Sequence, residues 1–366
     1  MKIETTCLDP VLIRRVLVTK LRHHGDVLLC TPVFASLKRQ LPGVEVDVLI
    51  LDETRDMLAD NPHIDQVYTI KKTRALGGGI AKLGYELRQL RELRRRRYDL
   101  LLHLTETSRG AALARLIKPR WSVGMDGPWS RHFKQSFSHL YFPLWGNRRH
   151  IVEQNLDALR VIGLYPEACD KQLVLLPGAD ARARVAGELA AAGMGGTPYL
   201  LLHPGSRWAY KTWPAERVAA LARRLLTDGH RIVLTGAPDP AERQMADAIL
   251  AALPAGHGVL DLVGKLSLRE LAAAIDGARL MLGVDSVPMH MAAALQTPVV
   301  ALFGPSNVHE WGPWRVAHRL VAADLPCRPC GLKGCANSGY SECLAQLPES
   351  TVLAAVAALL QETGAP

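Results

Sequence analysis

Residues 281–305 read MLGVDSVPMHMAAALQTPVVALFGP, and this stretch decides the fold. It begins as a short apolar strand, continues as a helix that opens near Pro288, and ends in a second apolar strand from Pro298 to Phe303. Proline is tolerated in the first turn of a helix, because its missing N–H would have no partner there. The pattern therefore predicts a strand, a helix and a second strand in a parallel arrangement.

Two polar residues, Asp285 and Ser286, stand between the first strand and the helix, and His290 lies one turn further on. Open α/β sheets bind ligands at the carboxyl ends of their strands, and a helix N-terminus at that edge favours an anion. Aspartate and serine are also ordinary helix caps. The stretch alone leaves both interpretations open.

The same alternation of strand and helix extends through the chain. Expected strands cover residues 15–19, 45–51, 66–70 and 99–104, then 199–202, 231–235 and 259–262. Short links between such elements are typical of a parallel sheet. Because 366 residues are many for one core, we expect two α/β domains with a cleft between them, residues 1–175 and 176–366. The final helix, 351–362, is a candidate to pack back on the first domain.

Three segments of the first half carry more specific expectations. A single helix is expected over Val27–Gln40, and Trp121–Phe142 has a loop-rich composition. Residues 80–98 form a helix with leucines at helical spacing and a cluster of arginines, including Arg88 and Arg91, on its other face. That face is either a solvated surface or a contact for anionic headgroups.

The positive charge of the chain is one-sided. Residues 1–175 contain 28 Lys and Arg against 19 Asp and Glu, whereas residues 176–366 contain 16 of each. A basic surface confined to one half suggests a polyanionic partner, namely nucleic acid, anionic lipid or a phosphorylated glycan. A solvated basic face without a partner is the alternative.

Composition bounds the class of protein and its location. The chain is 48% hydrophobic and 22% charged, as in globular proteins. No apolar run approaches the roughly 20 residues that span a bilayer, and residues 1–15 lack a signal-peptide core. We therefore expect a cytoplasmic protein. Seven cysteines, an odd number, disfavour a disulfide framework.

Two further segments carry residue types suited to chemistry. Gly25-Asp26 follows the first strand, and the Asp26 carboxylate either complements a helix dipole or accepts a proton from an incoming hydroxyl. In His203–Pro214, Gly205 and Ser206 offer donors to a phosphate, and Lys211 adds a positive charge before a helix. A solvated lysine is the alternative for Lys211. Together with Asp285 and Ser286, the segment indicates a diphosphate site.

Missing motifs exclude other enzyme classes. The chain has no G-x-G-x-x-G after its first strand, no P-loop sequence and no G-x-S-x-G elbow. Dinucleotide dehydrogenases, P-loop NTPases and α/β-hydrolases are therefore disfavoured. One cysteine cluster is either a structural zinc site or a set of free thiols, and no catalytic metal is expected. Its members are Cys327, Cys330, Cys335 and Cys343.

These segments resemble the ADP-heptose:lipopolysaccharide heptosyltransferases, most closely the heptosyltransferase III branch. The matching segments are Val16–Pro32, His203–Pro214, Val284–Ala294, Leu302–Ser306 and Cys327–Cys343. The resemblance implies the GT-B fold, two Rossmann-like domains of which the second binds most of the donor. It also implies inverting transfer of L-glycero-D-manno-heptose from ADP-heptose to the inner core of lipopolysaccharide, without an essential metal or other cofactor.

The resemblance also assigns roles at matching positions. Asp26 becomes the general base, Lys211 holds the donor diphosphate, Asp285 holds heptose hydroxyls, and His290 supports that loop. The hydroxyls of Ser206 and Ser286 donate hydrogen bonds to phosphate. The expected donor-binding set is Gly205, Ser206, Lys211, Asp285, Ser286, His290 and Gly304.

The basic first half suits an anionic acceptor glycolipid at the cytoplasmic face of the inner membrane, with the protein bound peripherally and no nucleic acid as partner. Candidate contacts for acceptor phosphate and carboxylate groups are Lys20, Arg22, Lys71, Lys72 and Arg74. Two alternatives stay open. One is an inverting glycosyltransferase that uses another nucleotide sugar. The other is a non-enzymatic binder of anionic glycolipid, for which the charge alone would account.

Overall fold

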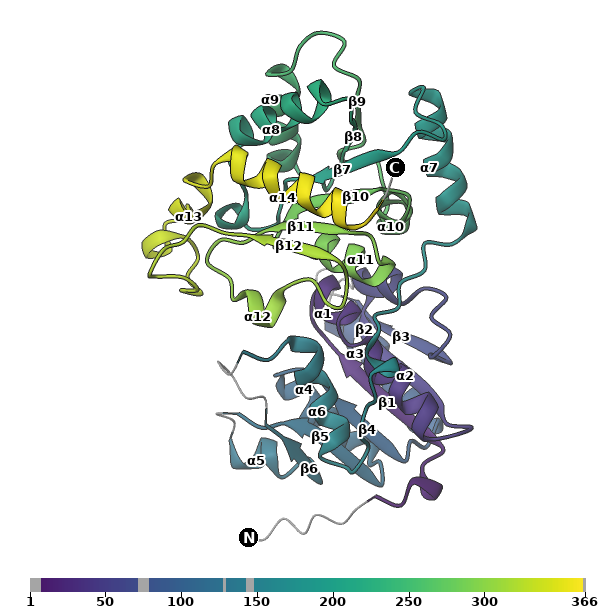
Figure 1. The fold of residues 1–366 in the computed structure, drawn as a ribbon. Coiled ribbons are helices and arrows are strands. Elements are labelled where there is room, and N and C mark those ends of the chain that lie inside the picture. The colour runs from purple at the N-terminus through teal and green to yellow at the C-terminus, as the bar shows by residue number, and fades with distance from the viewer. Residues whose placement is uncertain (1–7, 72–78, 128–129, 143–147, 365–366) are drawn as a thin grey trace. The chain divides into compact units, whose positions relative to one another are not determined.

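The computed structural model describes residues 8–71, 79–127, 130–142 and 148–364, and within the third helix it describes side chains from residue 83 onward. The chain divides into two compact units, Met1–Val174 and Leu175–Pro366 (Figure 1). In both units, parallel strands form a sheet with helices packed on it. Among the described residues, no helix combines the length and apolarity needed to cross a membrane.

The first unit is built on a sheet of six described strands in the order β3-β2-β1-β4-β5-β6. Its strands are β1 (Arg15–Lys20), β2 (Glu45–Leu51), β3 (Gln66–Ile70), β4 (Leu100–His103), β5 (Trp121–Met125) and β6 (His139–Tyr141). Its α-helices are α1 (His24–Leu28), α2 (Thr31–Gln40), α3 (Gly79–Arg95), α4 (Ser108–Ile117), α5 (Arg131–Lys134) and α6 (Ile151–Arg160). Short 3₁₀ helices are η1 (Pro10–Leu12), η2 (Asp52–Leu58) and η4 (Cys169–Lys171).

Helices cover both faces of this sheet. The chain crosses from β1 to β2 in one direction and from β3 to β4 in the other, so right-handed connections place α2 and α3 on opposite faces. Consistently, α3 packs against α4, and α2 packs against α6. Because both faces are covered, the central strands are mostly apolar and are buried over nearly all of their length, as is typical of parallel strands.

The second unit repeats this plan in the order β12-β11-β10-β7-β8-β9. Its strands are β7 (Tyr199–His203), β8 (Arg231–Leu234), β9 (Val259–Asp261), β10 (Leu280–Val284), β11 (Val299–Leu302) and β12 (His318–Val321). Its helices are η5 (Ala209–Lys211), η6 (Cys335–Asn337), α7 (Ala179–Ala191), α8 (Ala215–Thr227), α9 (Pro240–Ala251), α10 (Leu268–Asp276), α11 (Val287–Leu295), α12 (Val308–Trp311), α13 (Glu342–Ala345) and α14 (Glu349–Glu362).

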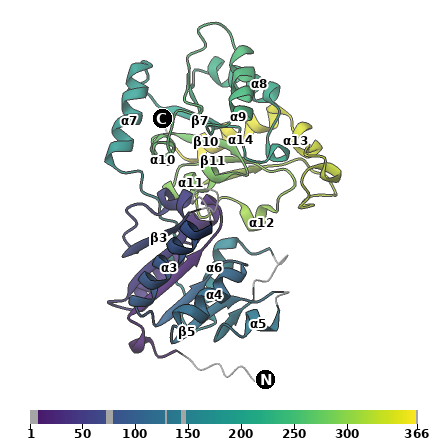
Figure 2. The same cartoon turned by 180° about the vertical axis from the view of Figure 1, so that it is seen from behind.

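The final helix belongs to the second sheet. Helix α14 packs against β11, β12 and α8, as both views show (Figures 1 and 2). Its buried side chains, Val352, Val356 and Leu359, join the core formed by Val218 and Leu302. Apolar residues three and four apart thus seal one face of this sheet.

In the first unit, local structure departs from the sequence prediction in two places. The single helix expected over Val27–Gln40 is two helices, α1 and α2, because Pro32 has no N–H to continue the ladder from α1. The region read as loop, Trp121–Phe142, contains β5 and β6, two short strands. Ser122 and Gly124 interrupt the apolar pattern of β5, so the sequence does not indicate a strand there.

Candidate functional site

Each sheet has one point where the order of its strands reverses. In the first unit the chain moves outward from β1 through β2 and β3, and then returns to place β4 on the other side of β1. In the second unit β7 and β10 stand in the same relation. Ligands of open α/β sheets bind at the carboxyl end of such a switch point. The residues that follow β1, β4, β7 and β10 are therefore the candidates in each unit.

In the second unit the switch point holds a short ion pair. Lys211 ends the 3₁₀ helix η5 after β7, and Asp285 directly follows β10. The Lys211 Nζ lies 2.5 Å from Asp285 Oδ2. The Lys211 side chain is 22% exposed and that of Asp285 is 6% exposed. The sequence predicted both as donor-binding residues, and the structure joins them in a charge-assisted hydrogen bond that fixes the ammonium group at the strand edge.

The helix that follows Asp285 begins without a side-chain cap. Ser286 is the N-cap residue of α11, yet its hydroxyl makes no capping hydrogen bond within the described chain. Its Oγ instead points back to the carbonyl of Val284, at 3.4 Å. Because a capped helix would use the serine oxygen on these N–H groups, the geometry disfavours the ordinary-cap interpretation. Pro288 has no N–H and the Met289 N–H donates to the Ser286 carbonyl at 3.2 Å, so this helix N-terminus attracts an anion through its dipole and the Val287 N–H.

The remaining residues of the expected donor set lie around this point. His290 is buried one turn into α11, and Ser206 Oγ accepts the Trp208 N–H at 3.3 Å. Packing also explains why positions 205 and 304 of this set are glycines. A Cβ on Gly205 would lie 2.3 Å from a carboxylate oxygen of Glu242, and one on Gly304 would lie 2.7 Å from Leu344 Cδ1.

Sequence reasoning missed Glu242, a partly buried acid in the first turn of α9. Its Oε2 accepts the Ala237 N–H at 2.8 Å and lies 4.0 Å from Nε2 of His203. Burial raises the pKa of Glu242 and lowers the pKa of His203 to about 4. Glu242 stands three residues after the N-cap Asp239, which is the usual pattern at the start of a helix. The sequence therefore gives no sign that Glu242 lies at the strand edge.

In the first unit Asp26 sits in the first turn of α1, directly after the β1 loop. Its side chain is partly exposed between the buried residues Gly25 and Val27. The helix N-terminus places partial positive charge near the carboxylate. An ionised carboxylate with one side open to solvent can accept a proton from a hydroxyl that reaches it.

The expected acceptor-binding residues fall into three groups. Arg22 and Lys71 are exposed, whereas Lys72 and Arg74 lie outside the described residues. Lys20 differs from the expectation, because it is 3% exposed and its Nζ is hydrogen-bonded to internal oxygens. A buried ammonium group with internal partners does not present its charge to an acceptor at the surface of the unit.

Comparison with known proteins identifies the family. The model of glycosyltransferase family 9 (heptosyltransferase) matches residues 87–341. Lipopolysaccharide heptosyltransferase 3 of Escherichia coli is 34% identical over 345 residues, which cover 93% of this chain and 97% of that protein. This chain belongs to glycosyltransferase family 9. Lipopolysaccharide heptosyltransferase 1 of Pseudomonas aeruginosa is 28% identical, over 88% of this chain and 87% of that one.

Solved structures of the family share the fold of this member. The family 9 glycosyl transferase of Veillonella parvula superimposes with a TM-score of 0.81 at 24% identity, over 97% of this chain and 99% of that one. ADP-heptose lipopolysaccharide heptosyltransferase II of Escherichia coli gives 0.73 at 22% identity, over 96% and 100%. The enzyme class and the GT-B type of α/β fold expected from the sequence are thus confirmed.

The cysteine segment of this glycosyltransferase does not form a metal site in the described chain. No group of three or more His, Cys, Asp or Glu side chains among the described residues is arranged to hold a metal ion. Cys327, Cys330 and Cys335 are exposed, whereas Cys343 is buried, and burial raises the pKa of its thiol. In the described structure these cysteines are free thiols.

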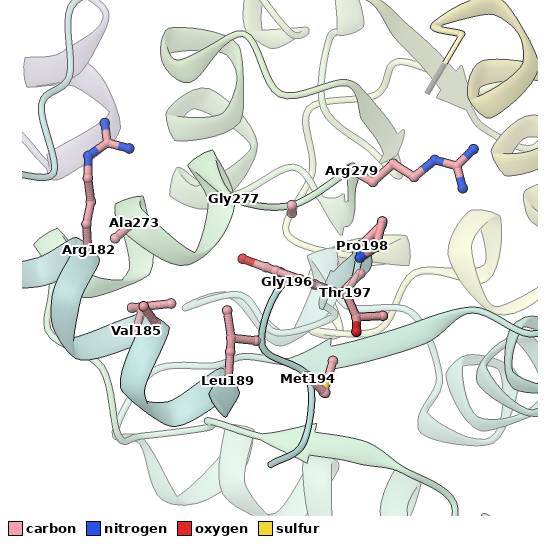
Figure 3. Close-up of a pocket in the computed structure, with 13 residues that line it drawn as sticks. Arg182, Val185, Leu189, Met194, Gly196, Thr197, Pro198, Ala273, Gly277 and Arg279 are labelled. Atoms are coloured by element: carbon pink, nitrogen blue, oxygen red, sulfur yellow. The ribbon is translucent and has the colours of Figure 1, made fainter. Parts of the chain in front are cut away.

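The second unit also contains a pocket of about 530 Å³. Figure 3 shows it between α7, whose Val185 and Leu189 line one wall, and the segment from Met194 to Pro198 that leads into β7. It therefore lies at the amino end of β7. Ligand sites in parallel sheets lie at the carboxyl end, so this pocket is at the edge opposite to Lys211 and Asp285 and is not the candidate site.

Proposed function

We propose that this enzyme transfers an L-glycero-D-manno-heptosyl group from ADP-heptose to the inner core of lipopolysaccharide. The relative that covers nearly the whole chain at 34% identity is a lipopolysaccharide heptosyltransferase 3. The single observation on this chain that carries the proposal is the ion pair of Lys211 and Asp285 beside the uncapped N-terminus of α11. A positive charge and a helix N-terminus without a side-chain cap, both at one strand edge, suit the diphosphate of a nucleotide sugar.

The proposed reaction is a single displacement with inversion at the anomeric carbon. The acceptor hydroxyl oxygen forms a bond to C1 of the heptose while the bond from C1 to the phosphate oxygen breaks. Asp26 takes the hydroxyl proton as the new bond forms. The electron pair of the broken bond leaves with ADP, whose added negative charge is stabilised by Lys211 and by the positive end of the α11 dipole. Asp285 orients Lys211 and, as the resemblance implies, accepts hydrogen bonds from heptose hydroxyls.

We assign the donor to the second unit and the acceptor to the first. The second unit carries the ion pair and the uncapped helix, and its net charge is zero. The first unit carries Asp26 and the whole positive excess of the chain. Because the inner core is anionic, an excess of Lys and Arg in the acceptor-binding unit favours its capture.

We also propose that the first unit contacts the cytoplasmic face of the inner membrane. Helix α3 exposes Leu83 at 58% and Leu87 at 48%, and the neighbouring α4 exposes Leu116 at 45%. Arg88 and Arg91 are exposed on the same helix α3. Leucines among arginines suit an interface where apolar side chains enter the bilayer and guanidinium groups bind lipid phosphates.

Vesicle sedimentation tests this contact. The double variant Leu83→Ser/Leu87→Ser should bind phosphatidylglycerol vesicles more weakly than the unaltered protein. Leu320→Ser, which alters a leucine that is 40% exposed in the second unit, is the matched control and should bind normally. Equal binding by the double variant would remove α3 from the membrane contact.

The reaction itself is tested by the mass of the product. Purified protein is given ADP-heptose and a panel of truncated inner-core acceptors, and ADP release is recorded. The proposal predicts ADP release together with the gain of one heptose on one acceptor. Transfer from another nucleotide sugar, but not from ADP-heptose, would replace the donor. Binding of acceptor without ADP release from any donor would contradict the proposed enzyme activity.

A further inference from the structure

The first unit buries a lysine for which the reaction proposed above gives no role. Lys20 is the last residue of β1 and is 3% exposed. Its Nζ donates hydrogen bonds to the carbonyl of Leu104 at 2.9 Å and to Oδ1 of Asn155 at 3.0 Å. Both acceptors are uncharged. A buried ammonium group without a carboxylate as direct partner costs free energy that an apolar side chain at this position would not.

Among the charged groups around Lys20, Asp26 has the largest effect on its pKa. Burial lowers the pKa of Lys20, and the largest opposing influence is the Asp26 carboxylate, which raises it. Glu106 also raises this pKa and Arg22 lowers it. The nearby Cys30 is a neutral thiol, because burial raises its pKa to about 12. Asp26 is therefore the negative charge that interacts most strongly with the buried ammonium.

Asn155 connects this ammonium group to the helix that carries Asp26. Its Nδ2 donates to the carbonyl of Leu29 at 3.1 Å. Leu29 is the C-cap of α1, and its own N–H donates to the carbonyl of Gly25 at 2.9 Å. A helix of five residues does not hold its shape alone. The amide of Asn155, from α6, therefore helps to fix α1 against the end of β1.

We propose that Lys20 and Asn155 are positioning residues for the Asp26 carboxylate. The buried ammonium group attracts the Asp26 carboxylate, and the amide holds both the ammonium and the C-terminal end of α1. This inference depends on the proposed role of Asp26 as general base, and it assigns a function to a lysine that the sequence suggested as an acceptor contact.

The burial of Asn155 can be inferred from the sequence once residues 151–160 are taken as a helix. Ile151, Asn155 and Leu159 are spaced four residues apart on α6 and are all buried. A buried amide between apolar residues requires internal hydrogen-bond partners. Here those partners are Lys20 and Leu29.

The pH dependence of kcat/KM tests the proposal. Without the buried positive charge, the carboxylate takes up a proton more readily, so Lys20→Met should move the acid limb to higher pH by about one unit. Dissociation constants for ADP-heptose should stay the same, because the donor belongs to the second unit. Lys38→Met is the matched control. It removes another ammonium of the first unit, bonded to Val44 and Asp65, and should leave the acid limb in place.

A second variant keeps the test valid if Lys20→Met does not fold. Asn155→Asp preserves the size of the side chain and the oxygen that Lys20 donates to. The new carboxylate neutralises the ammonium, so the acid limb should again move to higher pH. Loss of packing alone would lower the melting temperature or the rate without moving this limb.

The outcomes separate the two proposals. If Asp26→Asn is inactive while Lys20→Met and Asn155→Asp both keep the acid limb of the unaltered enzyme, the positioning role is contradicted and the base assignment stands. If Asp26→Asn retains full turnover, the base assignment fails and the positioning role fails with it. Upward movement of the acid limb in both variants, with unchanged donor affinity, supports the positioning role.

Discussion

The switch points of the two sheets hold their lysines in opposite ways. In the first unit Lys20 is buried and bonded to the neutral oxygens of Leu104 and Asn155. In the second unit Lys211 is partly exposed and paired with the Asp285 carboxylate. A buried ammonium acts on its neighbours through its field, whereas a partly exposed one can also contact a ligand. The same strand order thus supports an electrostatic role in one unit and a binding role in the other.

The largest effect should come from the proposed base of the first unit. Asp26→Asn keeps the size of the side chain but removes its ability to accept a proton. Turnover should fall by about 10²- to 10⁴-fold, the usual contribution of a general base. Single-turnover rates with saturating ADP-heptose measure this directly. Glu106→Gln, which removes a carboxylate beyond the end of β4, is the control and should retain far more activity. Equal losses in both variants would mean that Asp26 contributes only charge.

The next effect is on stability and comes from a buried histidine that each unit has at a strand end beside its switch point. His103 is hydrogen-bonded to Thr19, and His203 is hydrogen-bonded to Thr235. Burial lowers the pKa of each to about 4, below the usual value of 6.5. Between pH 6.5 and 4 the unfolded chain therefore binds protons that the folded chain does not, so stability is lost as the pH falls through this window.

Denaturant unfolding measures this loss. By roughly 1.4 kcal/mol per pKa unit, each histidine contributes at most ~3 kcal/mol to it. His203→Gln should flatten the pH dependence of the second unit, and His309→Gln, which alters an exposed histidine, should not. An unchanged slope in His203→Gln would show that this imidazole is not the group being protonated.

The smallest effect should come from the uncapped helix of the second unit. Ser286→Ala removes one hydroxyl from the N-terminus of α11 and leaves its N–H groups in place. Affinity for ADP should fall by about five- to tenfold, equivalent to about 1 kcal/mol, the net value of a typical hydrogen bond. Ser267 is the matched control, because its hydroxyl caps α10 in a capping box. Ser267→Ala should lower the melting temperature without weakening ADP binding. The reverse pattern would make Ser286 the structural cap.

The sequence predicted the local arrangement better in the second unit than in the first. Motifs at strand ends predicted that Lys211 lies near Asp285, as it does, because parallel strands bring their carboxyl ends together whatever lies between them. The short strands β5 and β6 were missed, since three to five residues with polar or glycine positions carry too little apolar pattern to reveal a strand.

The burial of Lys20 could not be predicted from the sequence. A lysine at a strand end is usually exposed. Its partner Asn155 is 135 residues away, on a helix whose packing depends on the completed sheet. The one expectation that this changes is the acceptor contact of Lys20, while Arg22 and Lys71 keep that proposed role as exposed side chains. Charge counts locate a basic unit, but they do not distinguish a surface cation from an internal one.

The division of labour between the two switch points is the central claim, and calorimetric titration with ADP-heptose tests it most directly. The account predicts that Asp26→Asn binds the donor as the unaltered protein does, whereas Lys211→Ala binds it about 10- to 100-fold more weakly, as expected for a lost charge-assisted contact. Weakened binding in Asp26→Asn, or unchanged binding in Lys211→Ala, would contradict the assignment of the donor to the second unit.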